Sequence, residues 1–165
     1  MNTRKLTVLS LCTTFALILS YIESLIPLSL AVPGIKMGLA NVAVLFVLYK
    51  FGTKEALAVS LLRVMLASLL FGTAVTFLYS FFGALFSFLL MAALKGVFHL
   101  SPLGTSVPGA VMHNVAQIGV AVVLLGAGAI FAYLPTLIIS GTVCGVLIGI
   151  LSALVVQKVK LPFQL

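Results

Sequence analysis

The side chains that could bind a charged ligand are few, and Arg63 is the most informative of them. It lies eight residues into an apolar stretch that begins at Glu55. An isolated arginine in the middle of a membrane helix costs about 2.5–3.5 kcal/mol, so such a residue faces a cavity, a partner or a ligand. Glu23, near the end of an earlier apolar stretch, can reach Lys36 or Arg63. Two cations with one nearby acid indicate either a salt bridge within the chain or a site for an anionic group.

A second polar cluster consists of His113, Asn114 and Gln117 in an otherwise apolar segment. His113 and Gln117 are four residues apart and share one face of a helix, and Asn114 lies close to that face. Three such side chains in one turn of a membrane helix must face the protein interior. They are expected either to form hydrogen bonds between helices, worth about 0.6 kcal/mol each, or to line a binding site. The imidazole of His113 could also ligate a metal or a haem iron.

The segment before the second apolar stretch combines a turn with features that attract anions. Pro33 and Gly34 form a strong turn signal, and Lys36 follows them. The helix that begins after this turn presents free N–H groups and the positive end of its dipole, with Asn41 near its start. The segment is therefore expected to be either an ordinary interfacial turn or part of an anion site.

The composition shows which elements must position these residues. Of the 165 residues, 63% are hydrophobic and 7% are charged, and the mean hydropathy is +1.38. Soluble domains carry about 25% charged residues, so a soluble enzyme, a disordered chain and a nucleic-acid binder are excluded. The net charge of +7 comes from cations that are spread singly rather than gathered into a basic stripe. A span needs about 20 residues, so the chain is long enough for about six membrane helices.

Prolines, glycines and charges divide the chain into one transmembrane domain, residues 1–165. The first apolar stretch, of about 21 residues, is longer than the ~7–15 residues of a signal-peptide core, so we expect it to be retained. The segment 97–107 is expected to be a loop, with Pro108 at the start of the fifth helix and His99 at the surface. The six predicted helices span residues 6–26, 37–49, 55–71, 75–94, 108–125 and 134–157.

The distribution of lysine and arginine predicts the orientation of this six-helix bundle. If the N-terminus lies inside, seven cations fall on the inner side and Lys36 alone falls on the outer side. Cytoplasmic loops are the ones enriched in Lys and Arg. An odd number of spans would place one of the two basic termini on the wrong side. We therefore expect both termini to be cytoplasmic, with the inner cations being Arg4, Lys5, Lys50, Lys54, Lys95, Lys158 and Lys160.

Two stripes of small residues predict close contacts between helices. In lipid, helices associate where small side chains let their backbones approach. The first stripe is Cys12, Ala16 and Ser20, and the second is Gly141, Gly145 and Gly149. Each stripe is expected to pack either within the bundle or against a partner protein.

The acidic residues that metal-dependent diphosphate chemistry requires are missing. The chain has no aspartate, and Glu23 and Glu55 are far apart in sequence, whereas Mg²⁺ sites on diphosphates use carboxylates. A G-x-x-x-x-G-K-[ST] phosphate loop is also absent. We therefore expect a protein that is not an enzyme, with no resident metal.

Several motifs together resemble the Gx transporter family over nearly the whole chain. Members of this family are often labelled heptaprenyl diphosphate synthase component I. The family is also similar to the substrate-binding S components of energy-coupling factor (ECF) transporters. The motifs are AVPGIKMGLAN at 31–41, LRV at 62–64, SPLG at 101–104, GAVMHNVAQ at 109–117 and YLP at 133–135.

The resemblance implies a six-helix protein of the bacterial inner membrane that binds a small nutrient near the outer face. Its partners would be a membrane coupling subunit and two cytoplasmic ATPases. Alanines four apart on the first helix of S components contact the coupling subunit, and the matching partner interface here is Cys12, Ala16 and Ser20. We expect an amphipathic, anionic ligand, bound by Glu23, Lys36, Asn41, Arg63, His113, Asn114 and Gln117.

Haem, a flavin-like compound and a quinone precursor are the ligand candidates, with haem expected only as a transported ligand. Two alternatives remain at this point. One is a membrane scaffold subunit of a prenyl diphosphate or quinone biosynthesis system. The other is an ion-coupled secondary transporter, which inverted repeats would favour; none is evident between the two halves of the chain.

Overall fold

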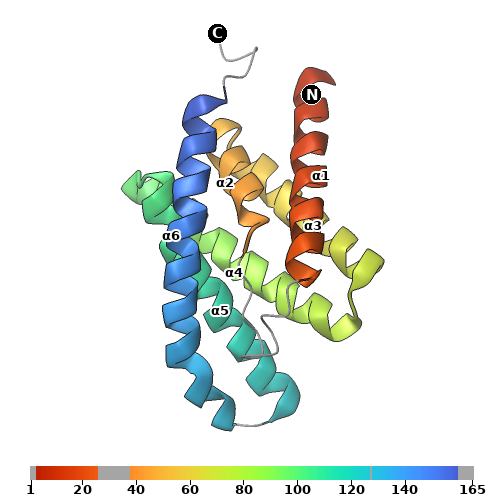
Figure 1. The fold of residues 1–165 in the computed structure, drawn as a ribbon, viewed down its shortest axis with the longest axis vertical. Coiled ribbons are helices and arrows are strands. Elements are labelled where there is room, and N and C mark those ends of the chain that lie inside the picture. Colours follow the sequence, from red (N-terminus) through yellow and green to blue (C-terminus); the bar gives the residue numbers. More distant parts are fainter. Residues whose placement is uncertain (1–2, 26–37, 127, 160–165) are drawn as a thin grey trace.

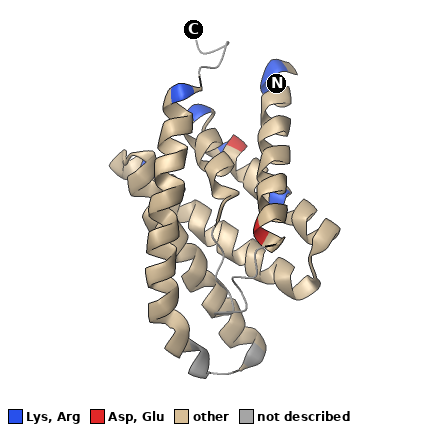
Figure 2. Cartoon of the chain, viewed as in Figure 1, with Lys and Arg blue, Asp and Glu red and all other residues tan. Residues whose placement is uncertain are grey.

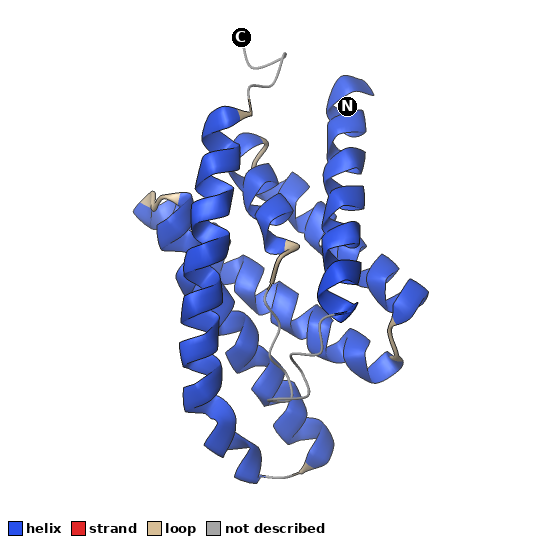
Figure 3. Cartoon of the chain, viewed as in Figure 1, coloured by secondary structure: helices blue, strands red, loops and turns tan. Residues whose placement is uncertain are grey.

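The computed structural model describes residues 3–25, 38–126 and 128–159, and the regular structure in these ranges is entirely helical (Figure 3). The chain alternates in direction from one α-helix to the next, so that the start of α1 and the end of α6 lie at the same end of the molecule (Figure 1). A 3₁₀ helix at Gly128–Tyr133 precedes α6. The α-helices are α1 (Thr3–Leu25), α2 (Asn41–Lys50), α3 (Thr53–Phe71), α4 (Ala74–Phe98), α5 (Pro102–Leu125) and α6 (Leu134–Lys158).

Four stretches in the described ranges are long and apolar enough to cross a membrane. They lie in α1, α4, α5 and in α6 together with the residues just before it. The helix α2 has only ten residues, about 15 Å of helix, which is half of a bilayer core of about 30 Å. The helix α3 has 19 residues but carries Lys54, Glu55 and Arg63. The fold is therefore an all-helical membrane bundle, and the count of six spans remains a prediction.

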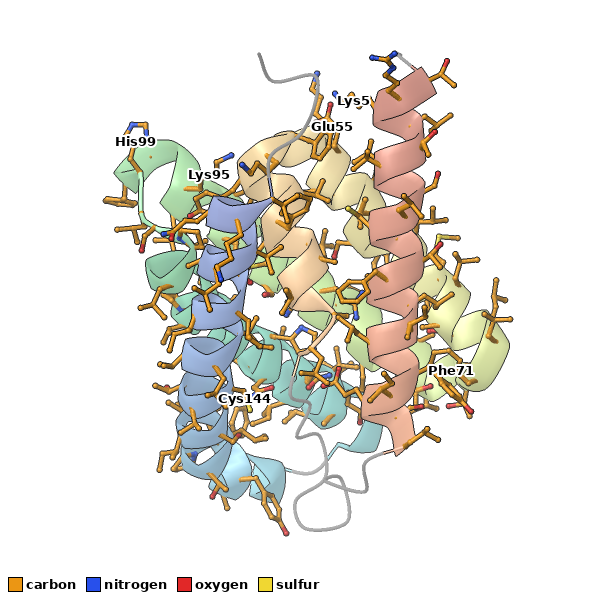
Figure 4. All side chains as sticks on the ribbon, turned by 45° about the horizontal axis from the view of Figure 1, so that its top comes forward. Lys5, Glu55, Phe71, Lys95, His99 and Cys144 are labelled. Carbon is orange, nitrogen blue, oxygen red and sulfur yellow. The ribbon has the colours of Figure 1, made fainter. Side chains whose placement is uncertain are left out.

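The segment between α4 and α5 corrects one expectation. The loop predicted over 97–107 is mostly helical, because α5 begins at Pro102 rather than at Pro108. The Ser101 hydroxyl accepts the Gly104 N–H at 3.3 Å, which caps the helix start. Pro108 is tolerated inside α5, where it removes one backbone hydrogen bond. His99 ends α4 in the left-handed conformation with φ 50° and is exposed, as predicted (Figure 4).

The short helix α2 forms the centre of the core. Every residue from Val42 to Leu48 is buried, and α1, α3, α5 and α6 all contact this helix. A helix that is apolar on all sides is stable only where it is covered on all sides. Phe88 and Met91 of α4 and Ile148 of α6 complete the same apolar cluster.

The glycine stripe of α6 packs against α5 within the chain. A Cβ atom added at Gly145 would lie 2.8 Å from the Cα of Val107, and one at Gly149 would lie 2.9 Å from the Cα of Leu103. Such distances leave no room for a side chain. The two backbones are thus in direct contact, and the alternative in which this stripe packs within the bundle is the one observed.

Most of the basic residues gather at the end of the molecule that holds the start of α1 and the end of α6 (Figure 2). The Lys5 ammonium and the Glu55 carboxylate form an ion pair at this end, with 2.5 Å between Nζ and Oε1 (Figure 4). This arrangement agrees with the predicted orientation, in which the basic end is cytoplasmic.

Labelling of single cysteines tests this orientation. In a chain with Cys12 and Cys144 replaced by serine, we expect an impermeant maleimide added outside intact cells to label Gly128→Cys. It should not label Thr53→Cys or Gly96→Cys, because these positions lie at the start of α3 and in the last turn of α4, beside the basic residues Lys54 and Lys95. As a control, all three cysteines should react with the maleimide in permeabilised cells. Labelling of Thr53→Cys and Gly96→Cys in intact cells would show that the orientation is the opposite of the predicted one.

Substitution of glycine tests the contact between α5 and α6. We expect Gly145→Ala to destabilise the protein by about 1–3 kcal/mol, because the new methyl group overlaps the backbone of α5. The matched control is Gly119→Ala, since a Cβ atom at Gly119 would meet no atom within 4 Å. Thermal melting in detergent, followed by circular dichroism, measures both. Equal melting temperatures for the two variants would contradict the contact.

Candidate functional site

The start of α2 is bound by an acid from another helix. The Glu23 carboxylate of α1 accepts the backbone N–H of Gly38 at 2.6 Å. Gly38 has φ +75°, a left-handed conformation that glycine adopts without cost, and its carbonyl oxygen accepts the Asn41 N–H that opens α2. The Glu23 carboxylate therefore binds the turn that leads into α2, near the positive end of the helix dipole. Lys36 lies outside the described residues.

The guanidinium of Arg63 points from α3 toward α1. Its Nη1 donates to the Ser20 hydroxyl at 3.2 Å, and its Nε is buried with no hydrogen-bond partner in the described part of the chain. The Glu23 carboxylate acts on Arg63 electrostatically, but no ion pair within 4.0 Å joins them among the described residues. A buried N–H group without an acceptor is costly, so Arg63 retains an unused capacity to bind an anion.

The structure therefore brings together three of the four residues predicted for the outer cavity. Glu23 is near the end of α1, Asn41 begins α2, and Arg63 is in the middle of α3. The Asn41 amide is close to Gly38, since its Nδ2 lies 3.3 Å from the place of a Cβ on that residue. We call the group of Ser20, Glu23, Gly38, Asn41 and Arg63 the arginine site.

The three polar residues of α5, His113, Asn114 and Gln117, have different surroundings. The Asn114 amide donates to the Leu137 carbonyl of α6 at 2.8 Å, so it forms the interhelical hydrogen bond that was one of its two expected roles. The His113 ring packs on Gly83 of α4, where an added Cβ would lie 2.8 Å from Cε1. Gln117 is 3% exposed, and its Oε1 has no partner within the described ranges.

The earlier start of α5 also changes the depth of His113. The sequence places it about five residues from the inner end of the fifth helix, whereas it is the twelfth of the 24 residues of α5. The imidazole is therefore at the middle of the helix, at a depth that a site open to the outside can reach. Among the described residues, no three His, Cys, Asp or Glu side chains gather where they could hold a metal ion.

The first stripe of small residues faces inward in this structure. Ala16 is fully buried against Ala40 and Ala43, Ser20 binds Arg63, and Cys12 packs against the core around α2. This arrangement supports the alternative in which the stripe packs within the chain. A contact of Cys12, Ala16 and Ser20 with a coupling subunit remains a prediction.

The residues that hold the far end of α2 carry no recognisable sequence signal for this role. Lys95 of α4 donates from Nζ to the Leu48 carbonyl at 2.5 Å and lies 5.2 Å from the centre of the Tyr49 ring. The Tyr49 hydroxyl is 2.5 Å from the Leu100 carbonyl and 2.6 Å from the Thr105 hydroxyl. The position of Lys95 near a helix end predicts only an inner-side charge, because its partner is 47 residues away.

Long apolar helices, a basic end and buried polar groups define a multi-pass membrane protein. The family model described as heptaprenyl diphosphate synthase component I matches residues 12–155, and the chain belongs to this family. The resemblance stated from the sequence motifs is thereby confirmed. No match was found among the curated proteins or among the solved structures.

A substitution at Ala16 distinguishes internal packing from a partner interface. We expect Ala16→Leu to lower the melting temperature of the isolated protein, because overpacking a buried site costs about 1–3 kcal/mol. The control is Ala93→Leu on the exposed face of α4. If Ala16→Leu instead melts like the wild type and loses only a co-purifying membrane subunit, the stripe is a partner interface.

Proposed function

We propose that this chain is the substrate-binding membrane subunit, or S component, of an ECF-type importer. It would capture a small amphipathic molecule with an anionic group at the end opposite the basic end. A membrane coupling subunit and two cytoplasmic ATPases would then drive release inward. Family membership supports this proposal, as do the helical bundle and its alternating helix directions (Figure 1).

Arg63 is the single observation that carries the proposal. Its guanidinium is partly buried and holds one hydroxyl ligand, Ser20, while its Nε is buried without a partner in the described residues. The nearest acid, Glu23, is already bound to the backbone N–H of Gly38. A desolvated guanidinium with free donors favours a planar anion such as a carboxylate, which it can bind through two parallel hydrogen bonds.

The ligand candidates share this anionic group on an apolar body. Haem carries two carboxylates, a flavin nucleotide carries a phosphate, and a naphthoate quinone precursor carries one carboxylate. His113, Asn114 and Gln117 would form the inner boundary of the site on α5. The unpaired Gln117 Oε1 would accept a hydrogen bond from a ligand donor, which a purely apolar molecule could not offer.

The family description supports a second candidate, a membrane scaffold for a prenyl diphosphate or quinone biosynthesis system. The residues do not supply the chemistry of such a synthase. The chain has no aspartate; Glu55 is paired with Lys5, and Glu23 is bound at the start of α2. We therefore propose that the chain itself is not an enzyme. Co-purification separates the two functions, since a scaffold would retain a soluble synthase and an S component would retain ATPases.

Two substitutions, one that removes a positive charge and one that removes a negative charge, test the arginine site. We expect Arg63→Gln to weaken binding of an anionic ligand by about one and a half to four decades, as removal of one partner of a desolvated charge pair costs about 2–5 kcal/mol. Glu23→Gln keeps an acceptor for Gly38 but removes the competing negative charge, so it should strengthen binding. Titration of the purified variants with haemin, flavin mononucleotide and a hydroxynaphthoate measures both effects.

A melting curve of each variant in the absence of ligand controls for folding. Arg63→Lys should bind less tightly than the wild type but better than Arg63→Gln, because lysine keeps the charge and loses the planar fork. If both Arg63→Gln and Glu23→Gln leave the affinity unchanged and lower the melting temperature, Arg63 is a structural residue. The binding site would then lie elsewhere.

A further inference from the structure

A groove between α1 and α3 runs along the surface of the bundle, away from the arginine site. It has a volume of about 550 Å³, and none of its lining residues belongs to that site. Leu9 and Leu17 of α1 line one wall, and Leu62 and Leu66 of α3 line the other. We propose that this groove binds one acidic glycerophospholipid, with an acyl chain along the leucines and the phosphate at Lys54.

The polar atoms of the groove favour a hydrocarbon chain over a polar ligand. The groove also contains Thr13, Thr14 and the exposed Ser10. The hydroxyls of the two threonines are the ones that bond within the helix. The Thr13 hydroxyl donates to the Leu9 carbonyl at 2.9 Å, and the Thr14 hydroxyl donates to the Ser10 carbonyl at 3.0 Å. These hydroxyls are thus satisfied within α1, so an apolar chain can cover them without leaving a donor unpaired. A sugar or nucleotide would find few partners here.

The length of the groove matches one leaflet of a bilayer. On α1 it extends from Leu6 to Leu17, which at 1.5 Å per residue is about 16 Å. Half of a hydrocarbon core of about 30 Å is about 15 Å. Leu6 and Leu62 are 49% and 48% exposed, so the groove opens sideways, where a lipid can enter from the bilayer. Ala58, with its small side chain, widens it near the charged end.

The charges at one end of the groove select the headgroup. Lys54 and Glu55 are both lining residues, and Glu55 is neutralised by Lys5. Lys54 is exposed, so two ammonium groups, those of Lys5 and Lys54, lie beside the single carboxylate of Glu55. It lies at the basic end of the molecule, which the positive-inside rule assigns to the cytoplasmic leaflet, where anionic lipids attract basic residues. Both headgroup classes offer a phosphate to Lys54, but a zwitterionic headgroup adds a cation that the basic end repels, so this end favours an acidic headgroup.

Native mass spectrometry of the full chain in detergent with equal amounts of phosphatidylglycerol and phosphatidylcholine tests the headgroup. We expect the wild-type chain to retain one phosphatidylglycerol molecule. In Lys54→Gln the preference for phosphatidylglycerol over phosphatidylcholine should fall about fivefold, which is the effect of one lysine at an anionic surface. Lys158→Gln, at the end of α6, is the matched control and should keep the wild-type preference. Equal losses in both variants would show a general charge effect and overturn the proposal.

Photo-crosslinking tests the groove itself. In nanodiscs containing phosphatidylglycerol with a photoreactive acyl chain, we expect labelled peptides from residues 6–17 and 58–66 of the wild-type chain. Ala58→Phe should abolish this labelling by filling the groove, whereas Ala93→Phe on α4 should not. Melting curves identify any variant that fails to fold. If Ala58→Phe does not fold, the distribution of labels on the wild-type chain still tests the proposal. Labels spread evenly over α4, α5 and α6 would overturn the proposal, as would unchanged labelling in a folded Ala58→Phe variant.

Discussion

The burial of α2 is the constraint on which the rest of the structure depends. This ten-residue helix is covered on every side, so the backbone groups at its ends cannot all rely on water. A carboxylate from α1, Glu23, binds at its N-terminal end, and an ammonium from α4, Lys95, binds at its C-terminal end. Each charge has the sign that the helix dipole favours. The preceding helix α1 and the more distant helix α4 are thereby oriented around it.

This arrangement leaves Arg63 without an ion-pair partner among the described residues. The chain has only two acids; one is bound at the start of α2 and the other is paired at the basic end. Arg63 therefore sits near an acid that is already bound elsewhere. Its contact with Ser20 ties α3 to α1, while its buried Nε remains without an acceptor in the described residues. Among the described residues, Glu23 is thus the one acid in the arginine site, and it forms no ion pair with Arg63.

The other half of the bundle is held by contact between backbones. Gly141, Gly145 and Gly149 let α6 touch α5, and Gly109 lets α5 approach α4, where the Ser87 hydroxyl donates to its carbonyl at 2.7 Å. In lipid, where apolar side chains gain little by meeting one another, such close packing supplies most of the attraction between helices. The helices α4, α5 and α6 are thus joined by close backbone contacts.

Hydropathy, charge and turn residues act locally along the chain, so they are enough to predict a membrane protein of this family, most of its helices and its basic end. The sequence also identified Glu23, Asn41 and Arg63 as a group, since polar residues are rare in apolar helices. The groups with which these three residues form hydrogen bonds depend on the tertiary structure. Glu23 binds the backbone N–H of Gly38, and α5 begins six residues earlier than predicted because Ser101 caps it and Pro108 is accommodated. Contacts such as Lys95 with Leu48 depend on which helices meet, and that follows from the summed packing of the whole bundle rather than from any local pattern.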